Sequence, residues 1–596
     1  MNAVPTFRDL STQAAKSFLL TAVVFDDVVT IETTAQPAAR LAEPPEVWEG
    51  IVEDVPSLRE EVTGPDTVEL GPAKAAAAAN ADGDAKTTPL ARMSSLTAGF
   101  SEQGIICAVL IPQADASEPS TDPAQIGLIA TARRADLLVL DWHLGIDRGH
   151  RTLAIIHEIV ERDRESGRTR LIAIYTDEPA LDVVEKMLLD GLADRVPLTR
   201  VSDGVLTSPQ LHIVVLGKAG GIAVPHEYEG CVVDDNQVAS RLIQEFTAMH
   251  AGLLGNLAMA ALGQLRERTH PLLARFDSAM DAAVAADRSM RAHPAEAEEL
   301  ALSLVLQDLQ SALDVVQLRH YVNLTAITAW LDTEKHSDGF WFPSTQDGVK
   351  LTREFVVDLL QSGKAHIEPP PNVRGWSRHK NDKSLTCIFA HHADTAALDS
   401  QFAQLTHVQT SLRTRRNADP PPVLHLGTIV SRPIQMLTTA AAPDKVDAPQ
   451  PANPSESRAY LICVQPECDS IRVTPARPFL FLPLSVRMTG ETPHYFDIAL
   501  EEPGVEILHL EVARQSFALI GIPFNPTREG VVEARRDTSD AERWLFPSAD
   551  DGPINYQWVA DLRPFQAQRI LQEFSATLAR IGIDEGEWGR THRRRP

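Results

Sequence analysis

The chain has 596 residues, of which 44% are hydrophobic and 23% charged, and its formal net charge is −26. This is ordinary globular composition, and the length suffices for about three domains. The strong negative balance argues against binding to nucleic acid or to an anionic membrane surface. Because there are five cysteines, no secretory signal and no apolar run of membrane-spanning length, we expect a soluble protein of a reducing cytoplasm.

The first third of the chain alternates short apolar runs with helical patterns. A helix is predicted from Phe7 to Leu20. A long polar stretch at about 33–96, with an Ala-rich segment, is predicted to be an insertion that is largely loop or disordered, with a partner-binding segment as the alternative. Strands are predicted at 18–25, 104–110, 135–140, 170–175 and 211–217, and further helices at 123–134, 152–162 and 178–189. Buried strands alternating with helices predict a doubly wound α/β fold, whose ligands bind at the carboxyl ends of the strands.

Polar residues follow four of these strands. Asp26 and Asp27 follow the first, Asp141 the third, Thr176 the fourth and Lys218 the fifth. Over about residues 8–225 this set resembles the receiver domain of two-component response regulators, which have an acidic pair, a phosphoacceptor Asp, a Thr or Ser and a Lys. The resemblance implies a five-stranded flavodoxin-like domain in which Lys218 pairs with phosphoryl oxygens and Thr176 moves towards them.

The same resemblance assigns a metal and a nucleophile. Asp26 and Asp27 would hold Mg²⁺ together with Asp141 and the backbone carbonyl of His143, and Asp141 would also become the aspartyl phosphate. Oxygen ligands suit this hard cation, which offsets the negative charge that two reacting anions bring together.

Three positions depart from the family pattern. Ala219 follows the lysine where a proline is usual, Val215 replaces an aromatic residue three positions before it, and Asp177 replaces a small residue after Thr176. We therefore expect the coupling from the phosphoryl group to the output to differ from the usual route.

The rest of the chain is predicted to form two further regions. After a domain at 1–225, the sequence is helical at 236–365, including a long helix from Ala295 to Leu318, and a mixed α+β region with Pro-rich linkers occupies 370–596. Strands are expected near 460–464, 478–484, 505–510 and 517–522, and a final helix at 564–581.

Cysteine and histidine residues in this last region raise the question of a metal site. Cys463 and Cys468, with Cys387, His391 and His392 upstream, are zinc-ligand types. Their spacing lacks a second Cys pair, and Cys463 lies in an apolar strand, so a core role is favoured over a structural metal site.

These patterns favour a phosphoacceptor protein of a two-component phosphorelay. Its partner would be a histidine kinase or a phosphotransfer protein, and it would either switch an output or drain phosphate from a kinase shared with a second response regulator. Bacterial stress or anti-phage signalling is a setting by analogy. Two alternatives stay open: an enzyme with an unrecognised catalytic site in residues 370–550 that the receiver regulates, and a scaffold that has lost phosphorylation. Enzyme activity beyond the receiver's own phosphorylation and dephosphorylation is not indicated.

Overall fold

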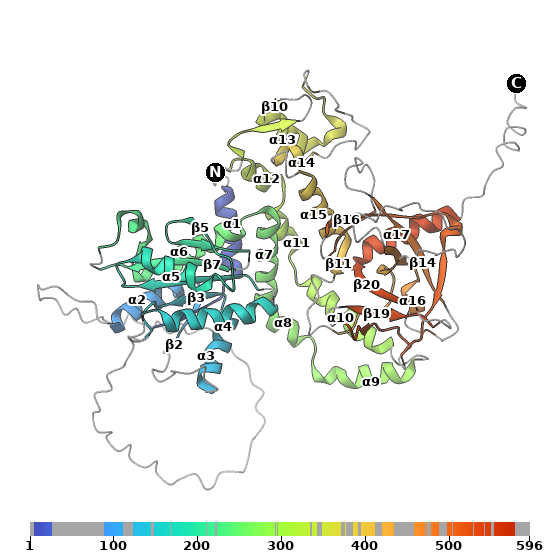
Figure 1. Cartoon of the computed structure of the whole chain (residues 1–596), viewed down its shortest axis with the longest axis horizontal. Coiled ribbons are helices and arrows are strands. Elements are labelled where there is room, and N and C mark those ends of the chain that lie inside the picture. Colours follow the sequence, from blue (N-terminus) through green and yellow to red (C-terminus); the bar gives the residue numbers. More distant parts are fainter. Residues whose placement is uncertain are drawn as a thin grey trace, which may run out of the picture. The chain divides into compact units, whose positions relative to one another are not determined.

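The computed structural model divides the chain into two units, Ser11–Ala251 and Met1–Leu10 with Gly252–Pro596 (Figure 1). None of the helices it describes is long and apolar enough to span a bilayer. The described residues are 5–26, 89–110, 123–144, 148–166, 168–209, 211–220, 223–291, 294, 296–333, 336–342, 348–370, 373, 376, 385–390, 395–411, 420–433, 458–470, 473, 478–487, 497–502, 505–527, 530–540, 543–549 and 554–578.

The first unit is built on a sheet whose central strands are parallel. Their spatial order is β2-β1-β3-β4-β7, which confirms the predicted doubly wound fold. Two short strands, β5 and β6, continue the sheet antiparallel beyond β7, and β8 pairs in parallel with the end of β7. The strands are β1 Thr21–Phe25, β2 Ile106–Leu110, β3 Leu137–Leu140, β4 Arg170–Thr176, β5 Thr199–Ser202, β6 Val205–Thr207, β7 Leu211–Lys218 and β8 Val232–Val233.

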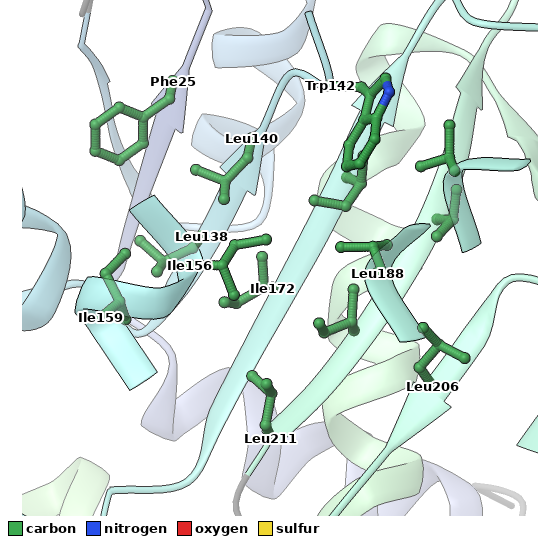
Figure 2. Packing of buried hydrophobic residues seen from close by; sticks show 14 of the residues in the cluster. Phe25, Leu138, Leu140, Trp142, Ile156, Ile159, Ile172, Leu188, Leu206 and Leu211 are labelled. Atoms are coloured by element: carbon green, nitrogen blue, oxygen red, sulfur yellow. The ribbon is translucent and has the colours of Figure 1, made fainter. Parts of the chain in front are cut away.

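Helices lie on both faces of this sheet. On one face, α3, α4 and α5 bury apolar residues against alternate residues of the strands; Figure 2 shows Ile156 and Ile159 of α4 and Leu188 of α5 in this core. Elsewhere in the unit, α2 packs on α6, α6 contacts β4, and the Phe18 and Phe246 rings stack 5.7 Å apart. The helices are α1 Phe7–Phe18, α2 Pro89–Glu102, α3 Pro123–Arg134, α4 His150–Ser166, α5 Leu181–Leu192 and α6 Val238–His250.

Three features of this unit differ from expectation or go beyond it. Residues 89–96, predicted as the end of a loop insertion, are helical and begin α2, while residues 33–88 lie outside the described part. The long connection before β7 forms the β5–β6 hairpin. The unit also continues past residue 225, because α6 buries Val238, Leu242 and Ile243 within it.

The second unit begins with helices. The predicted single helix from Ala295 to Leu318 is two helices, because the Asp314 side chain accepts bonds from the N–H groups of Val316 and Gln317, each 3.1 Å long, and so starts a new one. The helices are α7 Leu253–Glu267, α8 Thr269–Ala274, α9 Asp281–Met290, α10 Glu296–Ser311, α11 Val315–Leu318 and α12 Leu324–Leu331.

A small apolar cluster follows in the chain, built by a two-stranded sheet and short helices. It contains Phe342, Val356 and Cys387, consistent with the aromatic residues of this segment forming a core. Its elements are β9 Phe340–Phe342, β10 Val349–Leu351, α13 Arg353–Ser362 and α14 Thr386–Phe389.

The last part is a ten-stranded sheet, antiparallel at every pairing, with an apolar cluster on each of its two sides. Helices and antiparallel strands here confirm the mixed α+β class, whereas the boundary expected between residues 365 and 370 stays a prediction. The elements are α15 Thr395–His407, β11 Val408–Ser411, β12 Thr428–Pro433, β13 Arg458–Cys463, α16 Glu467–Ser470, β14 Pro478–Arg487, β15 Ile498–Glu502, β16 Val505–Val512, β17 Ile520–Pro523, β18 Arg535–Arg536, β19 Trp544–Pro547, β20 Asn555–Leu562 and α17 Pro564–Leu578.

Candidate functional site

Four of the polar residues singled out in the sequence lie at the carboxyl edge of the parallel sheet. Asp26, Asp141, Thr176 and Lys218 end or directly follow β1, β3, β4 and β7, which are neighbours in that order. The strands deliver them to one place because parallel strands all end at the same edge. Asp27, predicted beside Asp26, lies outside the described residues.

The Lys218 ammonium joins the two carboxylates. It donates a short hydrogen bond to Asp141 Oδ2 and lies 3.4 Å from Asp26 Oδ2. Lys218 is 6% exposed and Asp141 4%. Two carboxylates thus share one ammonium in a buried setting.

Burial acts on both partners of this pair. Burial raises the pKa of the Asp141 carboxyl and the neighbouring Asp26 raises it further, against the opposing pull of Lys218. Burial also opposes the charged form of Lys218, but Asp141 and Asp26 outweigh it and raise the pKa of the ammonium. The cluster carries one negative charge more than its single cation balances, which makes it receptive to a further cation.

The Asp141 backbone is held from two sides. Its N–H donates to the Phe25 carbonyl of β1 at 2.9 Å, and its own carbonyl accepts from the buried Thr152 hydroxyl of α4 at 2.8 Å. The Asp141 side chain accepts from the His143 N–H at 3.1 Å. The carboxylate is therefore held in place before any ligand arrives.

Thr176 is connected to the loop that carries Asp141 through a bridge of two side chains. Its hydroxyl accepts from the Glu178 N–H at 3.1 Å, and the Glu178 carboxylate lies 3.2 Å from His143 Nε2. His143 was predicted to contribute its backbone carbonyl, and this contact of its ring was not predicted. His143 and Glu178 each lie two positions after a predicted site residue, Asp141 and Thr176 respectively, and this placement could have indicated that they are near the site.

Tyr175 is a second residue near the site that was not predicted from the sequence. Val215 stands where the family has its aromatic residue and is fully buried in β7, but Tyr175 of β4 presents a ring to the site instead. The Lys218 ammonium lies 5.6 Å from the centroid of that ring, within cation–π range. An aromatic residue directly before the strand-end threonine was the available signal.

A family comparison matches this part of the chain. Residues 18–222 match the family model described as response receiver domain. Residues 18–222 are a receiver domain. The remainder of the chain has no family assignment. No curated protein and no solved structure matches the chain.

The residues of the receiver domain fit a divalent cation. Receiver domains generally bind Mg²⁺. Asp26 and Asp141 supply carboxylate oxygens of the hard type that this ion prefers, and their excess negative charge favours it. With the carbonyl of His143, they are the residues that would hold the ion.

The cysteines considered for zinc are divided between two cores. Cys387 is buried in the cluster around Phe342, and Cys463 is fully buried in the C-terminal sheet, where burial raises the pKa of its thiol to about 12. His391 and His392, like the side chain of Cys468, lie outside the described residues. Within the described part no three His, Cys, Asp or Glu side chains form a group that could hold a metal ion.

We expect Mg²⁺ to stabilise the receiver domain. At about 100 times its dissociation constant the ion adds ~2.7 kcal/mol, which raises the melting temperature of a unit of this size by about 5–10 °C. Thermal melting of the full chain with Mg²⁺ and with chelator measures this. Asp26→Asn should lose most of the shift, whereas Asp190→Asn, an exposed acid on α5, should keep it. Equal shifts in both variants would contradict this site.

Proposed function

We propose that this protein is the phosphoacceptor of a two-component phosphorelay, with Asp141 as the acceptor. The observation that supports this most is the buried cluster of Asp141, Asp26 and Lys218 at the carboxyl edge of a receiver sheet. A lysine between two carboxylates, one of them fixed by backbone contacts, suits transfer of an anionic group to the fixed carboxylate.

The transfer would use the side chains as follows. An Asp141 oxygen attacks the phosphorus atom, a new O–P bond forms, and the N–P bond of a phosphohistidine donor breaks, so that the imidazole nitrogen leaves with the electron pair. Lys218 turns to the phosphoryl oxygens and offsets their charge. Mg²⁺, when bound, would screen the repulsion between the carboxylate and the phosphoryl group.

Thr176 and Glu178 would respond to the product. The Thr176 hydroxyl can donate its proton to a phosphoryl oxygen while its oxygen keeps the bond from the Glu178 N–H. Because the Glu178 carboxylate repels a phosphoryl group, the His143–Glu178 bridge would have to hold it aside. The pair would therefore influence how long the phosphoryl group persists.

The partners follow from this chemistry. We propose a histidine kinase or a phosphotransfer protein as donor, in the cytoplasm, with no role for nucleic acid. The large second unit would be the output in a switch, and in a phosphate sink a second response regulator would share the kinase. A role in bacterial stress or anti-phage signalling is part of this proposal by analogy only.

The test is chemical labelling of the full chain. A small phosphodonor such as acetyl phosphate, with Mg²⁺, should place one phosphoryl group on the protein, and the label should survive acid but be released by base, as an acyl phosphate does. Chelation of Mg²⁺ should stop labelling. A label that resists base, or that forms equally well in chelator, would contradict the proposal.

A further inference from the structure

Tyr175 connects the phosphoacceptor site to a polar network outside it. The side chain is 4% exposed, directly precedes Thr176, and faces the Lys218 ammonium with its ring. Its hydroxyl donates to Asp235 Oδ1 at 2.6 Å and lies 3.1 Å from the Val233 carbonyl. Burial raises the pKa of this hydroxyl, and the Asp235 carboxylate raises it further, so the group remains a donor.

Asp235 in turn holds α2. The Arg92 guanidinium of α2 approaches both Asp235 oxygens, at 3.3 and 3.5 Å. Gly99, seven residues further along α2, packs directly against the backbone of Asn236. A Cβ atom at position 99 would lie 2.4 Å from the Asn236 carbonyl oxygen. The short helix η2, Asp235–Gln237, is therefore clamped between Tyr175 and α2.

The same segment is tied to Lys218 through the backbone. Lys218 pairs with Val233 in the parallel β7–β8 ladder, and the Ala219 N–H donates to the Val233 carbonyl at 3.2 Å. After Val233 the chain passes through η2 into α6, Val238–His250, and the second unit begins at Gly252. The helix α6 is thus the last element of the first unit before the chain enters the second.

We propose that Tyr175, Asp235 and Arg92 form a relay that reports the position of Lys218 to α6. This inference rests on the proposed function. In the relay, Tyr175 takes the role of the aromatic residue that the family has at the position of Val215. A phosphoryl group on Asp141 draws the ammonium towards its oxygens and away from its contact with the Tyr175 ring. The phosphorylated and unphosphorylated proteins then differ in the strength of the hydrogen bond from Tyr175 to Asp235. The phosphoryl group therefore favours one of two arrangements of η2 and α6 over the other.

The first experiment compares hydrogen exchange of amides 235–250 in the full chain with and without beryllofluoride and Mg²⁺. Beryllofluoride stands in for the phosphoryl group. We expect it to change exchange in the wild type and in Tyr228→Phe, but not in Tyr175→Phe, which keeps the ring and loses the hydroxyl. Tyr228 is the matched control, since its buried hydroxyl also bonds a carboxylate, Glu185 at 2.9 Å, without touching Lys218. Labelling of Asp141 should persist in both variants. An α6 response in Tyr175→Phe equal to that in Tyr228→Phe would overturn the relay.

A second experiment needs no phosphoryl group, so its failure is distinguishable from failure of the proposed function. In the unliganded protein, Lys218→Met and Asp235→Asn should each change exchange at the start of α6, and the double variant should depart from the product of the single effects by about threefold or more. Independent effects would show that Lys218 and Asp235 are not coupled and would refute the relay, whether or not Asp141 accepts a phosphoryl group. Coupling in a protein that cannot be labelled would support the relay while removing its proposed trigger.

Discussion

Asp141→Asn should abolish phosphoryl labelling, by about a thousandfold or more, while the receiver domain stays folded. The amide is nearly the same size as the carboxylate but is not nucleophilic, so no O–P bond forms. The backbone bonds to Phe25 and Thr152 do not involve the side chain and persist. Quantitative labelling with a radioactive small phosphodonor, with circular dichroism to monitor folding, measures this.

The control for this variant is Asp190→Asn, which changes an exposed acid of the same unit and should label like the wild type. Labelling of Asp141→Asn at the wild-type level would show that another residue accepts the phosphoryl group. Complete unfolding of the variant would instead be visible in its spectrum, and Asp141→Ala then offers a second test of the same loss.

Arg170→Met should destabilise the receiver unit by about 3–5 kcal/mol, because it removes the guanidinium that balances the charge of a buried carboxylate. Arg170 is 1% exposed and makes a bidentate ion pair with Asp163, at 2.6 and 2.8 Å. Its guanidinium also donates to the Ala132 and Ala135 carbonyls, at 3.2 and 2.9 Å, where α3 leads into β3. We expect the urea midpoint of the unit to fall by about 1–2 M.

Two further variants test whether the loss of stability comes from burial of the ion pair and not from the loss of any positive charge. Arg195→Met removes an ion pair with Glu161 that is about half exposed on both sides, and should cost no more than ~1 kcal/mol. The double change Arg170→Met with Asp163→Leu removes both buried charges and should recover much of the loss. A single Arg170→Met variant as stable as Arg195→Met would contradict this assignment.

The parts of the site that the sequence could predict share one property: they follow a recognisable buried strand. Each of Asp26, Asp141 and Lys218 is a charged residue at the end of an apolar run, and the fold brings the carboxyl ends of parallel strands together. The five-stranded, doubly wound fold followed from the resemblance.

The relay could not be predicted in this way, because its contacts join residues far apart in the chain. Tyr175 and Asp235 are 60 positions apart and Arg92 and Asp235 are 143 apart. The β5–β6 hairpin was missed for a different reason: all four residues of β5 are exposed, so the strand has no apolar alternation to reveal it. In the C-terminal part several strands were foreseen, but the path β15-β16-β14-β13-β12-β20-β19-β18 depends on long-range pairing.

The attachment of β8 to the end of β7 bears on how receiver modules are exchanged between proteins. A domain boundary drawn at residue 222, where the family match ends, would separate β7 from the strand that pairs with Lys218 and from the acceptors of the Tyr175 hydroxyl. A buried hydroxyl and a ladder N–H would then lose their partners, at a cost of about 1–3 kcal/mol each. A transplant or chimera of this module should therefore be spliced after Ala251, so that β8 and α6 stay with the acceptor aspartate.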